Sequence, residues 1–405
     1  MEWASALSTR PSLEAAVEEV VEQAQQRLKH SADLGILFIS SAFASEYSRL
    51  MPLLQERLSL PALIGCSGGG VIGVDHQGDI QEIETGAALS LTLAHLPDVQ
   101  VKPFHITTAV LPDLDGPPDA WIELMGVYPE AEPHFILLAD PMSGGTSELL
   151  QGLDFAYPGA IKVGGLADVG AVGNHSSLFC NDKHYREGLV GVALSGNVKL
   201  ETIVAQGCRP IGQPYRVAEG ERNILLKLEE QSLGSPTQTP LEILQALFEG
   251  MNEADRSLAQ RSLFVGVAQS AFKQDLEQGD FLIRTVLGVD PRTGAIAIGD
   301  RVRPGQRIQF HLRDAEASAE DLTLLLERYP VSRDPAQPLG ALLFACLGRG
   351  ESLYLEPNFD SRKFSHYFPN IPLSGFFCNG EIGPVGDATF LHGYTSVFGI
   401  VSRKG

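Results

Sequence analysis

The chain has 405 residues, 44% of them apolar, and a formal net charge of −20 at pH 7. This length exceeds the roughly 250–300 residues at which one hydrophobic core stops growing, so we expect two domains. The apolar content is sufficient for sizeable cores and argues against disorder of the whole chain. The negative charge repels polyphosphates and anionic lipid surfaces, so we expect neither nucleic acid nor membrane as a partner.

The first element that the sequence predicts is an amphipathic helix at residues 11–29. Its apolar residues fall at i, i+3, i+4, i+7 and i+11, starting at Val17, and Ser12 is a suitable N-cap. No apolar run reaches the roughly 18 residues of a membrane span. The start of the chain also lacks the basic and apolar regions of a signal peptide. We therefore expect residues 1–32 to form an N-terminal helical segment of a cytoplasmic protein.

A strand–helix–strand pattern then occurs twice. The first copy has a strand at 34–39, a helix at 42–58, a segment from Pro61 to Gly65, and strands near 87–94 and 99–106. The second copy has a strand at 135–138, a helix at 147–155, a segment from Pro158 to Gly164, and strands near 188–194 and 198–204. The matched spacing predicts an internal duplication of a β-α-β-β unit.

A third, looser copy follows a different region. Residues 231–240 are polar, contain two prolines and lack apolar periodicity, which is typical of a linker. Strands are then expected near 263–267, 281–287, 295–298 and 307–310, with a helix at 319–328. The third copy has a strand at 341–345, a helix near 361–367, a strand at 371–375 and a last strand at 391–401.

These elements predict a mixed α/β (α+β) fold of two modules, at 33–230 and 241–405, joined by the linker. Each module is expected to contain mixed sheets flanked by helices and built from repeated β-α-β-β units.

Two familiar glycine motifs do not fit their usual context. Residues 68–73 satisfy the dinucleotide pattern G-x-G-x-x-G, and residues 65–69 satisfy the hydrolase pattern G-x-S-x-G. Both patterns require a helix to open on the glycines, whereas residues 74–79 have the pattern of a strand and a turn. A glycine-rich turn is the favoured interpretation.

The cysteines and histidines give no metal pattern. Histidines are scattered without an HExxH motif. The five cysteines are widely spaced and form no CxxC, so neither a disulfide scaffold nor a metal site is expected, and reduced cytosol fits best.

Two segments at strand ends carry the candidate site. Residues 343–350 place Cys346 and Arg349 after an apolar strand, and residues 375–384 place Cys378, Asn379 and Glu381 in a glycine-framed turn that includes Gly380. The repeat makes the first segment equivalent to Ser40-Ser41 and 140–145, and the second to 66–70 and 164–168. Ligands tend to bind at strand ends of α/β sheets. The alternative is that Arg349 and Glu381 form only a structural salt bridge.

At these residues the chain resembles a known family. The stretches ALLFACLGRG at 341–350 and PLSGFFCNGEIGPVGDATFLHGYTSVFGI at 372–400 closely resemble the C-terminal FIST module (F-box and intracellular signal transduction). PALIGCSGGGVIG at 61–73 resembles the N-terminal FIST module. The resemblance extends from about residue 33 to residue 401. It implies a sensory domain for small ligands, with amino acids as suggested ligands, and it supplies no catalytic residues.

The first functional hypothesis is therefore a small-molecule-binding sensory protein in intracellular signal transduction, with no cofactor and no enzymatic activity. One alternative is a haem-based nitric oxide sensor, because some bacterial members resemble such sensors; it would need an axial His or Cys. A second alternative is an enzyme in which Cys346 or Cys378 is a nucleophile activated by Arg349. No effector domain is evident, so we expect a signalling partner protein in trans or a homo-oligomer.

For the site we hypothesise that Arg349 and Glu381 face one pocket. A guanidinium fork suits a carboxylate and a carboxylate suits an ammonium group, so the pair would hold a zwitterion. The residues expected beside them are Cys346, Cys378, Asn379 and Gly380, with Ser67 and Asp140 at the rim.

Overall fold

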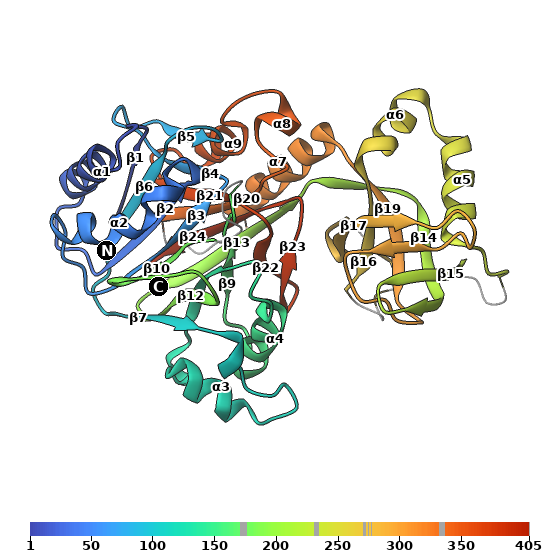
Figure 1. The fold of residues 1–405 in the computed structure, drawn as a ribbon, viewed down its shortest axis with the longest axis horizontal. Helices are drawn as coiled ribbons and strands as arrows, with labels where there is room; N and C mark the ends of the chain where they lie inside the picture. The colour runs from blue at the N-terminus through green and yellow to red at the C-terminus, as the bar shows by residue number, and fades with distance from the viewer. Residues whose placement is uncertain are drawn as a thin grey trace. The chain divides into compact units, whose positions relative to one another are not determined.

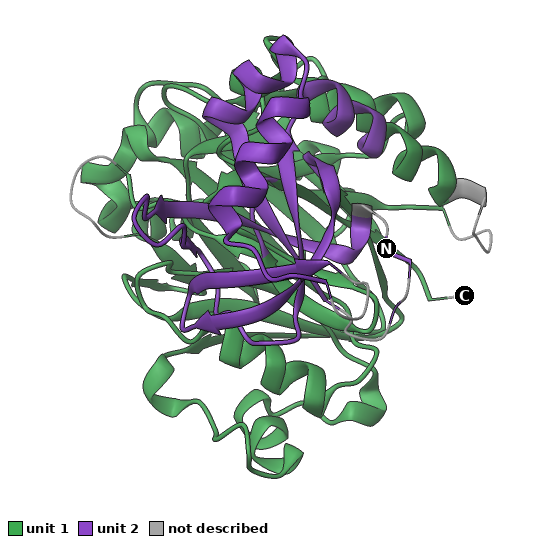
Figure 2. Ribbon diagram, turned by 90° about the vertical axis from the view of Figure 1, so that its right-hand side faces the viewer, with its two compact units in different colours: residues 1–205, 323–391, 395–405 green, residues 206–322, 392–394 purple. Residues whose placement is uncertain are grey.

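The computed structural model describes residues 1–170, 176–230, 235–269, 273, 275–276, 278–331 and 337–404. It contains two compact units, one formed by residues 1–205, 323–391 and 395–405, and the other by residues 206–322 and 392–394 (Figure 2). The division differs from the expected modules 33–230 and 241–405, because the second unit consists mainly of residues 206–322, which lie between the second and third repeats. Residues 231–234 of the expected linker lie outside the described residues, while Gln238 bridges to Leu228 and Pro240 begins a helix.

The second unit is a closed six-stranded barrel. Its strand order is β14 (Cys208–Glu221), β15 (Ile224–Glu230), β18 (Ile296–Ile298), β17 (Phe281–Val289), β16 (Leu263–Ala268) and β19 (Arg307–Arg313). Apolar side chains such as Val265 and Phe310 fill the interior. Helices α5 (Pro240–Gly250) and α6 (Glu253–Ser262) belong to this unit, and α5 begins with a capping box between Thr239 and Glu242. Closure leaves the barrel without an open sheet edge.

The first unit contains three six-stranded sheets. The first sheet has the order β1 (Glu2–Ser8), β6 (Leu89–His95), β2 (Leu34–Ser40), β3 (Leu63–Gly68), β10 (Leu178–Cys180) and β11 (Lys183–Tyr185). The second has β7 (Val99–Ile106), β12 (Leu189–Gly196), β8 (His134–Ala139), β9 (Lys162–Leu166), β22 (Glu381–Val385) and β23 (Ala388–His392). The third has β13 (Lys199–Gln206), β24 (Thr395–Ser402), β20 (Gly340–Cys346), β21 (Leu373–Cys378), β4 (Gly70–Val74) and β5 (Ile80–Ile83).

The three central strands of each sheet come from one repeat. In the first sheet β2 is parallel to β3 and antiparallel to β6. The same relations join β8, β9 and β12 in the second sheet, and β20, β21 and β24 in the third. The predicted duplication and the looser third copy are therefore confirmed.

The outer strands of each sheet come from a different repeat. The hairpin β4–β5, which follows β3, pairs with β21 in the third sheet. In the same way β10 follows β9 but pairs with β3, and β22 follows β21 but pairs with β9. Strand β7 follows β6 but pairs with β12 of the second sheet, so the expected grouping of 99–106 with the first repeat's own strands is wrong. One repeat supplies only the three central strands of a sheet. The strands added at its edges complete the six.

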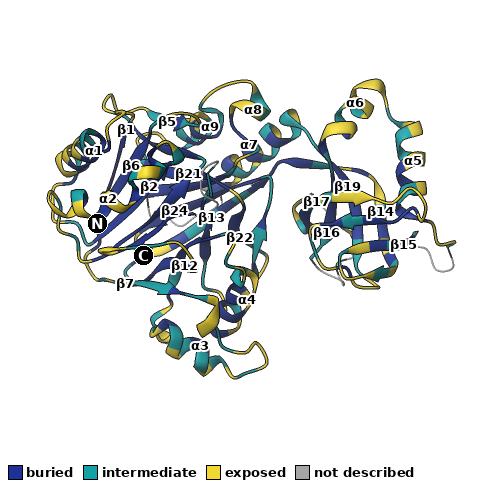
Figure 3. Ribbon diagram, viewed as in Figure 1, coloured by how far each residue is buried: buried dark blue, intermediate teal, exposed yellow. Residues whose placement is uncertain are grey.

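Helices cover the outer face of each sheet, and the inner faces share one core. Helices α1 (Leu13–Arg27) and α2 (Tyr47–Gln55) pack on the first sheet, and α3 (Pro118–Met125) and α4 (Thr146–Ala156) pack on the second (Figure 1). In the third repeat, Phe364 of α9 (Phe359–Tyr367) stacks on Phe398 of β24. The strands are buried while the helices expose one side (Figure 3). Ser12 caps α1 as predicted.

One glycine recurs at the same register in all three repeats. Gly65, Gly164 and Gly375 lie opposite Leu37, Leu137 and Leu343 on the parallel neighbouring strand. A Cβ at these glycines would lie 2.5, 1.7 and 1.9 Å from the leucine carbonyl oxygen. The close approach of the two backbones therefore requires glycine at each position.

A cycle of three backbone hydrogen bonds joins the ends of β3, β9 and β21. The amide of Gly69 donates to the Phe377 carbonyl (2.9 Å), that of Asp168 to the Ser67 carbonyl (3.0 Å), and that of Asn379 to the Leu166 carbonyl (3.1 Å). The three donors occupy equivalent positions, each four residues after the recurrent glycine. Each repeat thus donates to one neighbour and accepts from the other.

We predict that Gly375→Ala destabilises the first unit by roughly 3 kcal/mol or more, since its Cβ would displace the Leu343 carbonyl. The control is Gly386→Ala, where φ is +61° but no atom lies within 4 Å of a new Cβ; the backbone term alone costs about 1 kcal/mol. Urea unfolding followed by tryptophan fluorescence measures both, because Trp3 and Trp121 are the only tryptophans and both lie in the first unit. Equal losses in the two variants would contradict the prediction.

Candidate functional site

A cavity of about 160 Å³ lies at the carboxyl ends of β2 and β3. We call it the strand-end pocket; its lining residues are Ala44, Ser45, Tyr47, Ser48, Asp168, Val169, Gly170, Ser176, Ser177, His184 and Arg186. One wall is the segment that leads from β2 into α2, and the other comes from the end of β9 and the β10–β11 hairpin. Because that hairpin belongs to the second repeat, the pocket is a product of strand exchange.

Ser67, the next-to-last residue of β3, links the walls of the strand-end pocket. Its hydroxyl donates to the Asp168 carbonyl (2.8 Å) and accepts from the Ser177 amide (3.0 Å). The Ser177 hydroxyl in turn lies 3.0 Å from Nε2 of His184. Ser67 is buried, so its part in the site is to fix backbone on both sides of the cavity.

Asp168 presents the acidic group of the pocket. Its carboxylate accepts from Nδ2 of Asn379 (3.2 Å) and from the Gly170 amide (3.1 Å). Asn379 belongs to the turn after β21, so the third repeat orients a pocket residue of the second. The Asp168 side chain is partly exposed, and a carboxylate has further acceptor positions for a bound cationic group.

Arg186 and His184 supply the other titratable groups. Arg186 is exposed at the pocket wall. Burial, and then the positive charge of Arg186, lower the pKa of His184, so its imidazole is neutral at neutral pH. Burial and the negative charge of Asp168 raise the pKa of Tyr47, which stays a phenol. The pocket therefore holds one negative and one positive side chain among neutral polar ones.

Asp140 is buried next to the pocket residue Ser176. Its two carboxylate oxygens accept from the hydroxyls of Ser176 (2.7 Å) and Ser143 (2.6 Å). The Ser143 hydroxyl also accepts from the Gly188 amide (2.7 Å). Asp140 thereby positions the pocket residue Ser176 without reaching the surface.

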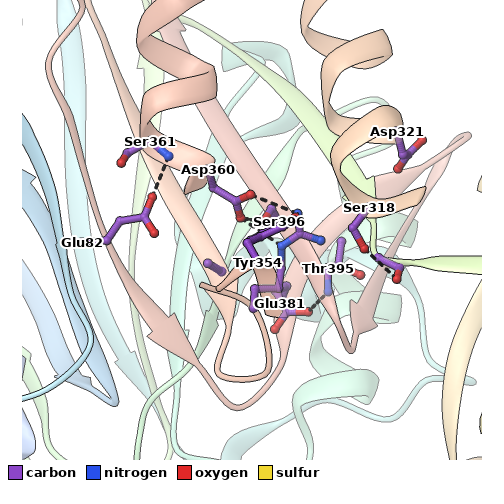
Figure 4. A network of polar contacts seen from close by, with 12 residues as sticks. Glu82, Ser318, Asp321, Tyr354, Asp360, Ser361, Glu381, Thr395 and Ser396 are labelled. Atoms are coloured by element: carbon purple, nitrogen blue, oxygen red, sulfur yellow. Dashed lines mark hydrogen bonds and ion pairs between the residues drawn. The ribbon is translucent and has the colours of Figure 1, made fainter. Parts of the chain in front are cut away.

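Arg349 and Glu381 lie elsewhere, in a buried ionic cluster with Glu82, Asp360, Ser396 and the half-buried Tyr354. Figure 4 shows Glu381 and these four partners. Arg349 and Glu381 are both 0% exposed. Nε of Arg349 lies 2.9 Å from Oδ2 of Asp360, and a terminal nitrogen lies 3.1 Å from Oδ1, which makes a bidentate pair. The same guanidinium donates to the Tyr354 hydroxyl, and Ser396 donates to Asp360.

The carboxyl groups of Glu381 and Glu82 are shifted toward the neutral form. Burial raises the pKa of Glu381 to about 8, against hydrogen bonds from the Thr395 amide and Cys378 and the charge of Arg349. Burial, followed by repulsion from Asp360, raises the pKa of Glu82 to about 7. With Glu381 largely protonated at neutral pH, the Arg349–Asp360 pair carries balanced charges in the core.

The residues that the sequence predicted for one site lie in two places, the buried ionic cluster and the strand-end pocket. Arg349 and Glu381 expose no surface, and the guanidinium pairs with Asp360 rather than with Glu381. Cys378 lies against Glu381, while Cys346 is partly exposed, and the Gly380 carbonyl accepts from the Leu166 amide. Ser67, Asp140 and Asn379 instead support the strand-end pocket. A ligand contact with Arg349 would require the buried ionic cluster to open.

Sequence reasoning missed Asp168, Arg186 and Tyr47 as site residues. Asp168 carried a usable signal, because it stands at the repeat position of Asn379. Arg186 carried none: it follows the three-residue strand β11, whose hairpin partner β10 pairs with β3 of the first repeat, and such distant pairing has no local signature.

At the strand-end pocket, the described residues do not provide the ligands or the space that a metal ion or a haem requires. Within the described ranges, no group of three His, Cys, Asp or Glu side chains is arranged to hold a metal ion. His184 lines the strand-end pocket, but Nε2 lies 3.0 Å from the Ser177 hydroxyl and its ring stacks on Phe179. The cavity is also smaller than the roughly 300 Å³ at the lower end of pockets for drug-sized ligands. The described residues of this pocket do not fit haem.

Comparison with known proteins places the chain in a family. The profile of the FIST N domain matches residues 33–231, and that of the FIST C domain matches residues 240–384. The chain belongs to the FIST family, whose domains are generally sensory, signal-transduction domains that bind small ligands. None of the described helices is both long and apolar enough to cross a membrane.

Similar proteins occur in bacteria, plants and animals. An uncharacterized protein of Mycobacterium tuberculosis (strain ATCC 25618 / H37Rv) is 34% identical over 391 residues, which cover 96% of this chain and 97% of the relative. An F-box/LRR-repeat protein of Arabidopsis thaliana is 25% identical over 308 residues, 67% of this chain and 58% of the relative. F-box only protein 22 of Homo sapiens is 30% identical over 116 residues, 24% of this chain and 29% of the relative.

We predict that Asp360→Asn destabilises the first unit by about 3–5 kcal/mol, because it leaves the Arg349 charge buried without its counter-charge. The control is Glu356→Gln, which breaks the exposed pair between Arg362 and Glu356 and should cost less than about 1 kcal/mol. Urea unfolding by tryptophan fluorescence measures both. A loss below about 1 kcal/mol in Asp360→Asn would mean that the buried pair is not needed for stability.

The pKa of Glu381 predicts a specific pH dependence. The folded value near 8 lies above the ordinary value of 4.5. Between these values the unfolded chain releases the proton first, so the free energy of unfolding falls as pH rises from about 4.5 to 8. Relative to wild type, Glu381→Gln should flatten this fall by up to about 1.4 kcal/mol per pH unit. An unchanged slope in Glu381→Gln would refute the assignment.

Proposed function

We propose that this protein is a sensor of intracellular signal transduction that binds a small zwitterion, such as an amino acid, in the strand-end pocket. The observation that carries the proposal is the placement of Asp168 and Arg186 on the lining of one small cavity. An ammonium group would pair with the Asp168 carboxylate, and a carboxylate would pair with the Arg186 guanidinium.

The dimensions and walls of the pocket support a small polar ligand. Its volume of about 160 Å³ far exceeds the roughly 10–15 Å³ that hold one water molecule, yet it is well below that of pockets for drug-sized compounds. Hydroxyl groups from Ser45, Ser48 and Ser177 lie on the lining. Such walls offer hydrogen bonds to a polar ligand, and the cavity is too small for a lipid or a large aromatic group.

Two observations favour a sensory role for this protein over an enzyme with a cysteine nucleophile. A nucleophilic cysteine must form a thiolate. Burial raises the pKa of Cys378 well above its ordinary value, so this thiol is not held as a thiolate ready to attack a substrate. The position of the chain in a sensory family supports the same choice.

The signal would leave the pocket through the elements that form it. A ligand held between Asp168 and Arg186 would tie the end of β9 to the β10–β11 hairpin, and Asn379 connects Asp168 to the third repeat. In this proposal the ordered surface is recognised in the cytoplasm by a signalling partner in trans or by a second copy of the chain.

We predict that an amino acid at about 100 times its dissociation constant raises the melting temperature of the first unit by roughly 5–10 °C, since binding adds about 2.7 kcal/mol. A thermal-shift screen of amino acids, with their amine-only and carboxylate-only analogues, tests this. Only compounds with both groups should give the full shift.

Variants identify the pocket as the place of binding. Asp168→Asn should abolish the shift that depends on the ammonium group, and Arg186→Gln the shift that depends on the carboxylate. Asp182→Asn, an exposed change in the turn of the same hairpin, should keep the full shift. The proposal fails if no amino acid stabilises the parent protein, or if both pocket variants respond as the parent does.

A further inference from the structure

Cys346 and Cys378 are neighbours on adjacent strands. Cys346 is the last residue of β20 and Cys378 the last of β21, and they are direct partners in the register of this parallel pair. Neighbouring strands lie about 4.8 Å apart, which is within the roughly 4.4–6.8 Å between Cα atoms of a disulfide. The structure contains both as thiols.

The two thiols contact the same carboxyl group. Sγ of Cys378 lies 3.5 Å from Oε1 of Glu381 and also donates to the Ala345 carbonyl (3.3 Å). Cys346 hydrogen-bonds to Glu381 as well, and this contact helps to hold down the pKa of that carboxyl. Both side chains therefore project toward one point, as a disulfide requires.

The environment makes the two cysteines unequal. Cys378 is 0% exposed, and burial raises the pKa of its thiol. Cys346 is partly exposed, and the attraction between its thiolate and the Arg349 guanidinium is one of the effects that raise the pKa of Arg349. A cationic neighbour favours the thiolate, which is the form that oxidants attack. An oxidant in solution reaches the partly exposed Cys346 before the buried Cys378, which suits Cys346 as the attacking residue and Cys378 as the resolving one.

We propose that Cys346 and Cys378 form an oxidisable dithiol that a hydroperoxide converts to an intrachain disulfide. The Cys346 thiolate attacks one peroxide oxygen, the O–O bond breaks, and hydroxide leaves, giving Cys346 sulfenic acid. The Cys378 sulfur then attacks the Cys346 sulfur, the S–O bond breaks, and water leaves with the Cys378 proton. Two thiols and one hydrogen peroxide thus give one disulfide and two waters.

The disulfide would alter the buried ionic cluster. It removes the S–H group of Cys378 that now donates to Glu381, while the Thr395 amide still donates to the same carboxyl. It also links the segment that carries Arg349 to the turn that carries Glu381. Oxidation at this site does not depend on the ligand proposed for the strand-end pocket.

The test treats the reduced full-length protein with hydrogen peroxide under native conditions. Thiol titration after denaturation should fall from five to three per chain. Peptide mapping should show a Cys346–Cys378 linkage that is about 2 Da lighter than the two reduced peptides together. A trivalent arsenical, phenylarsine oxide, should bind the native reduced protein in one equivalent, because it requires two adjacent thiols.

Variants distinguish this pair from the other cysteines. Cys346→Ser should lower the disulfide yield and the arsenical binding at least about tenfold, and Cys180→Ser should leave both unchanged. Measurements on wild type do not depend on how a variant folds. The proposal is overturned if wild-type protein keeps five thiols, if the linkage joins a different pair, or if Cys346 is oxidised to sulfinic acid while Cys378 remains a thiol.

Discussion

The cycle of three backbone hydrogen bonds at the ends of β3, β9 and β21 is the constraint on which the first unit depends. Each repeat supplies three central strands of a sheet, and its remaining strands complete sheets of other repeats. A single repeat would therefore leave an open sheet and an uncovered inner face, which is costly in water. The fold exists as a set of three, and the strand-end pocket forms where one repeat meets the strands of another.

A difference between the repeats explains why a carboxyl group lies in the core of the first unit. Val71, Leu178 and Glu381 occupy equivalent positions, opposite Phe376, Cys66 and Gly165 on the neighbouring strands. Two repeats place an aliphatic side chain there, and the third places a carboxyl group in the same apolar surroundings. Its raised pKa, and the nearby Arg349–Asp360 pair, follow from that substitution within the repeat.

The sequence predicted the repeated strands and helices well, because apolar periodicity and the recurrent Pro-to-Gly spacing are local signals. It also pointed to Asn379 through the glycine-framed turn, and to Ser67 and Asp140 through repeat equivalence. It could not reveal that Arg349 pairs with Asp360, since any carboxylate nearby in space would serve equally. Nor could it place Arg186 beside Asp168, because β10 joins β3 across more than a hundred residues, and such pairing leaves no local trace.

Strand β1, at the beginning of the chain, occupies the place in the first sheet where the repeat pattern predicts a strand that follows β24. Strands β7 and β13 follow β6 and β12 and cross to the next sheet, whereas the described residues after β24 form no strand; β1 fills the corresponding place beside β6 over seven registered pairs. In topological terms the first unit is a ring of three repeats that has been cut open between β24 and β1. The residues at the two termini are thus consecutive in the architecture although they are farthest apart in the sequence, and circular permutation would be a change of starting point rather than of fold.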